Sequence, residues 1–400
     1  MRTGRAVCVC FLLILLLLSG CGCTVRPQAE PRADEIRAVW ICSFELIFPT
    51  EDRTEPSFRA MAQRMIDNIR RCGLNTVFLQ VRPFSDAIYR SEIFPYSAAV
   101  SGVEGEDPGY DALEIFCACA HKAGISLHAW INPFRIGATS GLGKKAQSNP
   151  AKQILLDNDP DNDSRIADVD GMLYYDPANP ENQKLILSGV RELLEKYSIN
   201  GIHIDDYFYP TTEDYIDQKE YDTYTFSGGS ELRDDWRRAQ INLLVSRLYT
   251  CVKSFGKDKI FSISPALNIE NNRSKLYADT ARWAAFDGYC DWLIPQVYVG
   301  YRHQTHPFDE TVAQWQALDR NENVRLLFGL AAYKSGKEDP YAGSGRKEWV
   351  EDDGVLSRQI RDLREKKAGS GFALFSYSYI FEDNLSNNSP SEISSVISML

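Results

Sequence analysis

The sequence has 400 residues, 44% of them hydrophobic, which is enough to bury the core of one large domain. Its formal net charge of −11 at pH 7 argues against nucleic acid and anionic lipid headgroups as electrostatic partners. The ten cysteines show neither a CxxC motif nor the Cys/His spacing of a metal site, and we therefore expect no cofactor and no metal.

The first 20 residues are predicted to be a lipoprotein signal peptide. Arg2 and Arg5 precede an apolar run, residues 7–18, that is too short for a transmembrane helix. The run ends in Leu-Ser-Gly-Cys, which resembles a bacterial lipobox with cleavage before Cys21 and lipid on its thiol. An ordinary secretory signal followed by a chance cysteine is the alternative.

Three segments follow from this interpretation: a signal peptide (1–20), a lipidated tether (21–35) and one domain (36–400). The lipid would be the only attachment to a membrane, and the protein would lie in the cell envelope, on the outer face of a bacterial membrane.

From residue 36 onward, short apolar runs alternate with amphipathic stretches, the pattern of a parallel sheet. Helices are expected at 57–72, 112–122, 181–197, 234–255 and 356–367. Strands are expected at 38–44, 76–82, 126–132, 201–205, 260–266, 292–299, 325–332 and 371–378. Eight strands separated by helical stretches favour an α/β fold of the (β/α)₈ TIM-barrel type over an open sheet.

Two long connections follow the third and fourth predicted strands, at residues 135–179 and 208–232. In a barrel such insertions lie on the rim of the active site. The first contains an acidic run, 157–163, with Asp168 beyond it, and its alternating oxygen ligands resemble a calcium loop. Because Asn162 stands where the tight-turn glycine belongs, a solvated acidic insert is the preferred interpretation.

The central motif is Gly-Ile-His-Ile-Asp-Asp-Tyr-Phe-Tyr-Pro, residues 201–210. A short buried strand ends here in Asp205 and Asp206, followed by three aromatic residues. Two adjacent carboxylates push their pKa values apart, so that one can serve as an acid and the other as a base or stabiliser. We therefore take both as candidate catalytic residues. The alternative is an acidic N-cap on a strand-to-helix turn.

Alternate residues of a barrel strand point inward, and here the inward positions near the strand ends are polar or aromatic. This pattern predicts a ligand pocket, and the alternative is a self-satisfied polar core layer. His203 shares its parity with Asp205, and we expect its imidazole to hold or orient that carboxylate. Tyr209 and Tyr301 offer further rings for sugar faces. The substrate-binding candidates are Arg82, Asp86, His128, Trp130, Asn132, Arg135, His203, Tyr207, Gln296 and Tyr298.

These strand ends resemble the glycosyl hydrolase-like family 10 proteins of the bacterial envelope. The matching segments are 36–40, 79–89, 128–135, 176–180, 201–210 and 295–298, and they follow one another in order over nearly the whole domain. The resemblance implies a (β/α)₈ barrel that hydrolyses glycosidic bonds, with peptidoglycan glycan strands as the polysaccharide substrate. It places the family's strand-four aspartate on Asp205 or Asp206.

The second carboxylate is left open, because the fifth predicted strand carries no acid at its end. Glu45, Asp86, Asp206 and Glu270 are the candidates. The Asp205–Asp206 pair with Tyr298 also resembles N-acetylglucosaminidases that use the acetamido group of the substrate as nucleophile, which would remove the need for a distant second acid. The competing function is a non-catalytic glycan-binding lipoprotein on the same barrel.

Overall fold

The computed structural model describes residues 31–47, 52–382 and 390–400. The predicted signal peptide, Cys21 and the tether up to residue 30 lie outside the described residues. No helix in the described part of the chain is long and apolar enough to cross a membrane.

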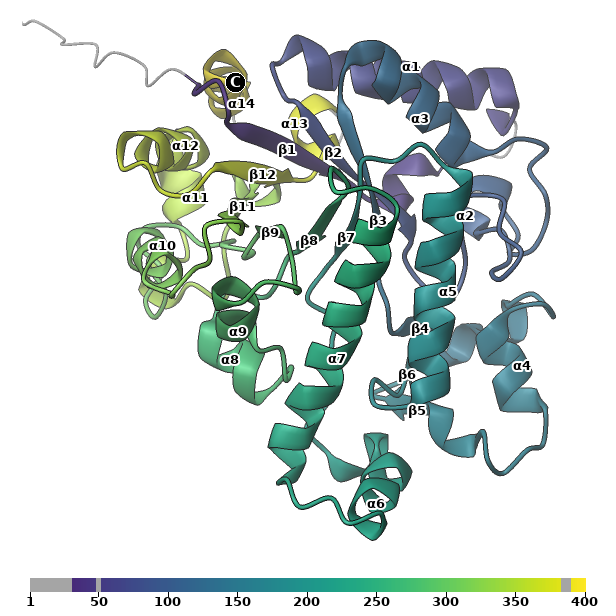
Figure 1. The fold of residues 1–400 in the computed structure, drawn as a ribbon. Coiled ribbons are helices and arrows are strands. Elements are labelled where there is room, and N and C mark those ends of the chain that lie inside the picture. Colours follow the sequence, from purple (N-terminus) through teal and green to yellow (C-terminus); the bar gives the residue numbers. More distant parts are fainter. Residues whose placement is uncertain (1–30, 48–51, 383–389) are drawn as a thin grey trace, which may run out of the picture.

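Nine parallel strands form a nearly closed barrel (Figure 1). In chain order they are β1 (Ile36–Ile41), β2 (Thr76–Arg82), β3 (Ser126–Ile131), β7 (Gly201–Ile204), β8 (Ile260–Ile263), β9 (Trp292–Leu293), β10 (Arg325–Leu326), β11 (Phe328–Ala331) and β12 (Gly371–Phe375). The sheet order is β10-β9-β8-β7-β3-β2-β1-β12-β11.

One run of chain joins the two edges of this sheet. β10 and β11 are separated only by Leu327, and β10 pairs with β9 while β11 pairs with β12. An isolated bridge between Gln296 and Gly329 adds a further link. The (β/α)₈ TIM barrel predicted from the sequence is therefore confirmed, and each of the eight predicted runs contains strand.

Helices surround the barrel (Figure 1). The long ones are α1 (Glu55–Arg71), α3 (Ala112–Ala123), α5 (Pro180–Lys196), α7 (Arg233–Ser254) and α12 (Val355–Glu365). Shorter ones are α2 (Ala98–Ser101), α8 (Ile269–Ser274), α9 (Thr280–Ala285), α10 (Phe308–Gln316), α11 (Glu348–Glu351), α13 (Ser378–Phe381) and α14 (Pro390–Met399). Helix α1 shows how sequence sets these elements. The Thr54 side chain caps its first turn, and Phe58, Met61 and Met65 bury one face.

The two long connections carry structure of their own. After β3 come β4 (Arg135–Ala138), α4 (Pro150–Leu156), β5 (Ile166–Val169) and β6 (Met172–Tyr175), whose strands form an antiparallel sheet in the order β4-β6-β5. After β7 come η5 (Asp214–Ile216) and α6 (Gln218–Phe226). In Figure 1 these elements lie toward the end of the molecule where α7 begins.

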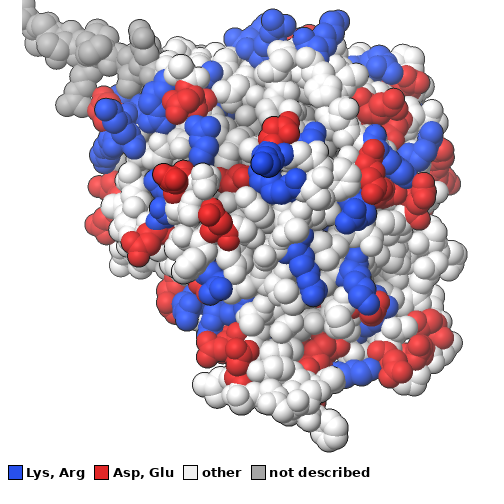
Figure 2. Space-filling model, viewed as in Figure 1, with Lys and Arg blue, Asp and Glu red and all other residues white. Residues whose placement is uncertain are grey.

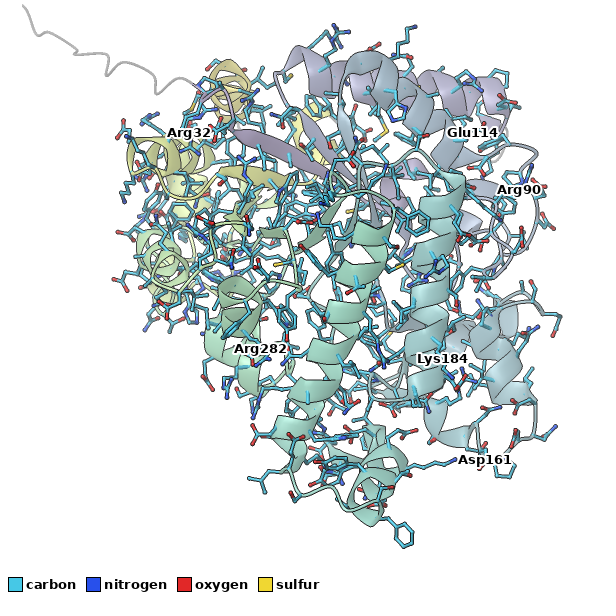
Figure 3. The ribbon with its side chains drawn as sticks, viewed as in Figure 1. Arg32, Arg90, Glu114, Asp161, Lys184 and Arg282 are labelled. Carbon is cyan, nitrogen blue, oxygen red and sulfur yellow. The ribbon has the colours of Figure 1, made fainter. Side chains whose placement is uncertain are left out.

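The acidic run at 157–163 forms hydrogen-bonded turns. Asp157 accepts the backbone N–H of Asp159, and Asp159 accepts that of Asp161. Asp161 forms an ion pair of 3.3 Å with Lys219 and lies at the edge of the molecule in Figure 3. Asp168 belongs to β5, where its carboxylate accepts the Thr139 hydroxyl. These oxygens are engaged in local structure, and over the described ranges no cluster of three or more acidic, His or Cys side chains could hold a metal ion.

The inside of the barrel is filled by large rings. Trp40, Phe78, Trp130 and Trp292 form an inner cluster, separate from the larger core between strands and helices. His128 stacks on Trp292, with ring centroids 4.9 Å apart. Gly201, at the start of β7, lies beside the His128 ring. A Cβ at this position would lie 2.8 Å from Nδ1 of His128 and would overlap the carbonyl oxygen of Ile260, so the position requires glycine.

On the face shown in Figure 2, basic and acidic side chains are interspersed. A surface of this kind offers little long-range attraction to a polyanion. The cysteines among the described residues are free, and all except the half-buried Cys72 are buried like small apolar side chains.

Candidate active site

Asp205 lies at the carboxyl end of β7 and is held by two neighbours from β3 and the residues just after it. The indole Nε1 of Trp130 donates to Oδ2 over 3.0 Å, and Nδ2 of Asn132 lies 3.2 and 3.3 Å from the two carboxylate oxygens. The amide of Asn132 is oriented because its Oδ1 accepts the backbone N–H of Arg135. Only 4% of Asp205 is exposed, so its carboxylate has one fixed position.

Asp206 is partly exposed and is held from the opposite side. Its carboxylate is hydrogen-bonded by the side chain of Gln296, which also donates through Nε2 to the carbonyl oxygen of Ser264, 3.0 Å away. The two adjacent acids are thus held by residues from different parts of the sheet, Asp205 from β3 and the residues after it and Asp206 from the segment after β9.

The electrostatics of the pair favour a shared proton. Burial and, to a smaller extent, the charge of Asp206 raise the pKa of Asp205 to about 7, against the opposing effects of the Trp130 N–H and Arg135. Burial also raises the pKa of Asp206, against the Gln296 hydrogen bond and the charge of Arg135. Two interacting carboxyl groups of this kind titrate as a unit, so the pair can share a proton.

A cation and aromatic rings surround the pair. The guanidinium of Arg135 lies over the ring of Phe84 at 5.0 Å and over that of Tyr207 at 4.4 Å. The Tyr207 side chain is exposed. Tyr298 packs against Phe375, with centroids 5.6 Å apart, and burial raises the pKa of its hydroxyl well above the usual value, with a smaller contribution from the charge of Asp206. Such rings and a cation suit the faces and hydroxyl groups of sugars.

His203 does not orient Asp205, and this expectation is wrong. Its Nε2 accepts the indole N–H of Trp40 at 3.1 Å, and its Nδ1 lies 2.8 Å from the hydroxyl of Ser262. Both ring nitrogens are therefore engaged inside the barrel. Burial holds the pKa of His203 well below its usual value and that of His128 at about 3, so both imidazoles are neutral.

His128 lies nearer the start of its strand than Trp130, is fully buried and accepts or donates one hydrogen bond with Ser126. The two histidines thus belong to a buried polar layer below the mouth of the barrel, in which both nitrogens of His203 are hydrogen-bonded and Nδ1 of His128 has no partner. The alternative interpretation, a self-satisfied polar layer, holds for His203, whereas Trp130, Asn132, Asp205 and Gln296 gather at the mouth.

Arg82 is not at the mouth of the barrel, because β2 contains a bulge. Gln80 pairs with Trp130, but Arg82 pairs with Ile131, so one extra residue reverses the parity. The guanidinium lies 4.6 Å over the Phe94 ring and beneath helix α5, where a Cβ on Gly189 would come within 2.5 Å of its NH1. The predicted substrate-binding role of Arg82 does not fit this position.

The other acids left open by the sequence are held by neighbours of their own. Glu45 closes the loop after β1 by accepting the N–H groups of Cys42 and Ser378, and Glu270 is exposed in the first turn of α8. Asp86 lines a separate pocket. The acid whose charge acts most on Asp205 is Asp206.

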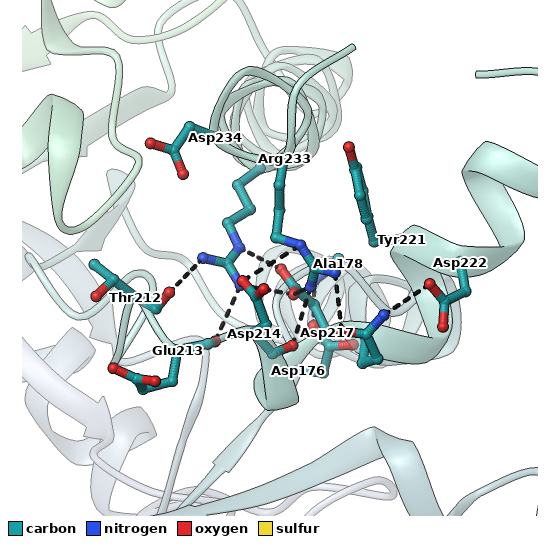
Figure 4. Close-up of polar contacts among 12 residues, drawn as sticks. Asp176, Ala178, Thr212, Glu213, Asp214, Asp217, Tyr221, Asp222, Arg233 and Asp234 are labelled. Carbon is teal, nitrogen blue, oxygen red and sulfur yellow. Dashed lines mark hydrogen bonds and ion pairs between the residues drawn. The ribbon is translucent and has the colours of Figure 1, made fainter. Parts of the chain in front are cut away.

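The chain that leaves the pair is fastened to α7. Arg237 is 1% exposed and binds both carboxylate oxygens of Asp217, at 2.6 and 2.8 Å, and the carbonyl oxygens of Thr212 and Glu213 (Figure 4). Arg233 adds a hydrogen bond of 3.0 Å to Asp217. This arginine clamp fixes the segment from residue 212 to residue 217 and, through it, the exit of the chain from β7.

Two rings that the sequence offered for sugars are engaged by other residues. Tyr209 is buried beside the clamp, where it packs against Tyr277 and lies 5.3 Å from the Arg237 guanidinium. Tyr301 is held elsewhere, by Asp362 and Arg358. Two residues that the sequence analysis missed take their place near the pair, Phe84 and Phe375. Phe84 follows the predicted second strand in a Pro-Phe-Ser-Asp turn. Its position directly after a strand end could have marked it as a residue near the mouth of the barrel.

Comparison with known proteins gives the chain a family. Residues 35–344 match the family described as Glycosyl hydrolase-like 10. The chain is 32% identical over 347 residues to "Glycosyl hydrolase YngK" of Bacillus subtilis, covering 82% of this chain and 66% of that protein. It is 30% identical over 391 residues to "Glycosyl hydrolase DigH" of Escherichia coli K12, covering 89% and 85%.

Among solved structures, the glycoside hydrolase domain of PgaB (BpsB) from Bordetella bronchiseptica shares the fold, with a TM-score of 0.59 and 15% identity over 88% of this chain and 97% of that one. The family and these relatives support glycoside hydrolysis as the class of activity. With the matched region spanning the barrel from before β1 to beyond β11, the chain belongs to the Glycosyl hydrolase-like 10 family.

Proposed function

We propose that this protein is a lipid-anchored glycoside hydrolase that cleaves an amino-sugar polymer of the bacterial cell wall, namely the glycan strands of peptidoglycan. The observation that carries the proposal is the Asp205–Asp206 pair, held by Trp130, Asn132 and Gln296 at the carboxyl end of β7. Barrel enzymes place their catalytic groups at this face, and glycosidases require a proton donor beside a negative charge.

The two acids differ in their surroundings, and we assign their roles from that difference. Both oxygens of Asp205 face N–H donors, which keep the carboxylate in place, and the Trp130 N–H opposes the rise of its pKa. Asp206 is more exposed, so we assign it as the group that delivers the proton shared by the pair. Asp205 therefore stabilises positive charge on the sugar, and Asp206 is the general acid.

An acetamido sugar supplies the nucleophile in this mechanism. Its carbonyl oxygen attacks the anomeric carbon while the bond to the leaving sugar breaks, and the leaving oxygen takes the proton from Asp206. The cyclic oxazolinium ion carries a positive charge beside Asp205. Water then adds to the anomeric carbon, reopens the ring and returns a proton to Asp206, so that no distant second carboxylate is needed.

Membrane attachment is proposed on the sequence at residues 18–21 and places the barrel outside the cytoplasm, where wall polymers occur. Tyr207, Tyr298 and Arg135 provide the polar and aromatic surface on which a glycan would lie.

The deciding experiment incubates the soluble chain from residue 31 onward with purified glycan strands and measures new reducing ends. A hydrolase produces them in proportion to enzyme and time, and the Asp205→Asn variant does not. Retention of the glycan without new reducing ends, in protein whose melting is normal, would show a binding protein instead.

A further inference from the structure

A pocket of about 760 Å³ lies among the loops after β1, β2 and β3, and neither the proposed mechanism nor the family assignment uses it. It is enclosed by the residues that follow β1, β2 and β3, which places it on the same face of the barrel as Asp205. Its volume is in the range of small-molecule and sugar sites. Its apolar wall includes Phe44, Ile47, Phe84, Ala98, Val103 and Ile136.

Two chains of contacts connect this pocket to Asp205. Phe84 forms part of the pocket wall and packs under Arg135, whose charge acts on both catalytic acids. On the other side, the backbone N–H and hydroxyl of Ser43 donate to the side chain of Gln80, which is in register with Trp130. Phe84 through Arg135, and Gln80 through Trp130, therefore link the pocket wall to neighbours of the catalytic pair.

The polar groups of the pocket leave one carboxyl group available. Glu104 is neutralised by Lys145 at 3.3 Å and accepts the N–H of Ala146 and the amide of Asn149. Asp86 is 5% exposed, lines the pocket and is hydrogen-bonded by the Ser97 side chain, while its Oδ1 has no hydrogen-bond partner.

An acetamido group suits this lining. Its methyl group would pack on the aliphatic wall, and its amide can bond to a carboxyl in either protonation state. A carboxylate on the ligand would instead meet the buried Asp86, and the exposed Lys144 at the rim is too well solvated to offset that repulsion.

We propose that this pocket is a separate sugar-binding subsite, which takes an uncharged N-acetylated sugar of the same polymer next to the unit on which Asp205 and Asp206 act. The inference rests on the proposed glycan activity for the class of ligand. It adds that affinity comes partly from a unit that does not react, and that this unit carries no acidic substituent.

The test compares the Kd values of N,N′-diacetylchitobiose and of the corresponding N-acetylated tetrasaccharide by calorimetry, in an Asp206→Asn background that prevents cleavage. We expect the tetrasaccharide to bind at least about tenfold more tightly than the disaccharide. Ala98→Trp and Val103→Trp, which add bulk at two positions of the pocket lining, should each reduce this gain to about twofold or less.

Ala313→Trp, an equal substitution on the exposed face of α10, serves as the matched control and should keep the full gain. The proposal is overturned if both pocket variants keep the gain, or if the parent shows none. Cleavage by the wild-type chain is measured separately. Pocket-dependent binding without any cleavage would refute the hydrolase and leave the subsite standing.

Discussion

The indole N–H of Trp130 donates to Oδ2 of Asp205 across the β3–β7 pair, over 3.0 Å. Because Trp130 is only 5% exposed, its ring is not available as a sugar-stacking surface. Its contribution is made through Asp205, whose charge it stabilises and whose position it fixes. Trp130 is a positioning residue.

Replacing Trp130 with Phe keeps most of the ring and removes the donor. We expect kcat to fall about tenfold with KM changed less than twofold, since the lost contact stabilises charge that matters in the transition state. The pKa of the acid pair should also rise, which moves the pH–rate profile to higher pH. A raised KM with unchanged kcat and profile would instead assign Trp130 to substrate binding.

Asp205→Asn should lower kcat by about 10² or more, since it removes a preorganised charge while keeping the shape of the side chain. Reducing-end assays on glycan strands measure the loss, and thermal melting checks the fold. Asp319→Asn, at an exposed position after α10, is the control and should behave as wild type. Near wild-type cleavage by Asp205→Asn would move the leading role to Asp206.

Stability should respond to pH through the same residue. The folded-state pKa of Asp205, about 7, lies above the ordinary value of 3.8, so its contribution to stability is full below pH 3.8 and is lost as pH rises through 7. Asp205→Asn avoids that loss and should be more stable than wild type by on the order of 4 kcal/mol at pH 8. At pH 3.5 denaturant unfolding should show no such gain, and a gain of equal size there would contradict the assignment.

Activity should also depend on the proton of the pair. With burial and mutual repulsion raising both pKa values, kcat/KM should be greatest in mildly acidic solution and fall as pH rises above about 7. In Asp206→Asn the residual activity should lose this alkaline decline. If the decline persists unchanged, Asp206 is not the proton donor.

Arg82 is expected to affect packing and not substrate affinity. Its NH1 and NH2 are buried without hydrogen-bond partners, so Arg82→Met, which fills similar space without a charge, should leave the melting temperature unchanged or raise it. We expect KM and kcat within about twofold of wild type. A large increase in KM in folded protein would return Arg82 to the substrate site.

Cys21→Ala tests the proposed anchor. The full-length variant should leave the membrane pellet and appear in the soluble envelope fraction, while the barrel keeps its melting temperature. The matched control is Cys23→Ala, which removes a cysteine two residues further on and should remain in the pellet. Persistence of Cys21→Ala in salt-washed membranes would exclude the lipobox interpretation.

The strands were predictable because apolar runs at regular spacing leave few other ways to bury them. The direction in which the Arg82 side chain points could not be predicted from the sequence. The bulge in β2 depends on how β2 pairs with β3, and nothing within residues 76–82 announces it. A shift of one residue turns a side chain from the interior of the barrel to the helix layer.

The acid pair could be predicted because it lies at the end of a strand, but the hydrogen-bond partners of His203 could not be predicted. Parity shows which residues share the interior, whereas depth along the barrel decides which of them meet. Trp40 and Ser262 lie 163 and 59 residues from His203 in the chain, and only the closed barrel brings them to its two nitrogens.

The arginine clamp on α7 divides the connection after β7 into two parts with different freedom to change. Residues up to Asp217 are tied to Arg237, and Lys219 and Glu220 at the start of α6 bond to Asp161 and Asn179. No side chain of α6 is completely buried, so segments of other lengths and sequences can be exchanged between residues 222 and 231 with the catalytic pair left in place. Diversification among relatives, and grafting in the laboratory, should concentrate in that interval.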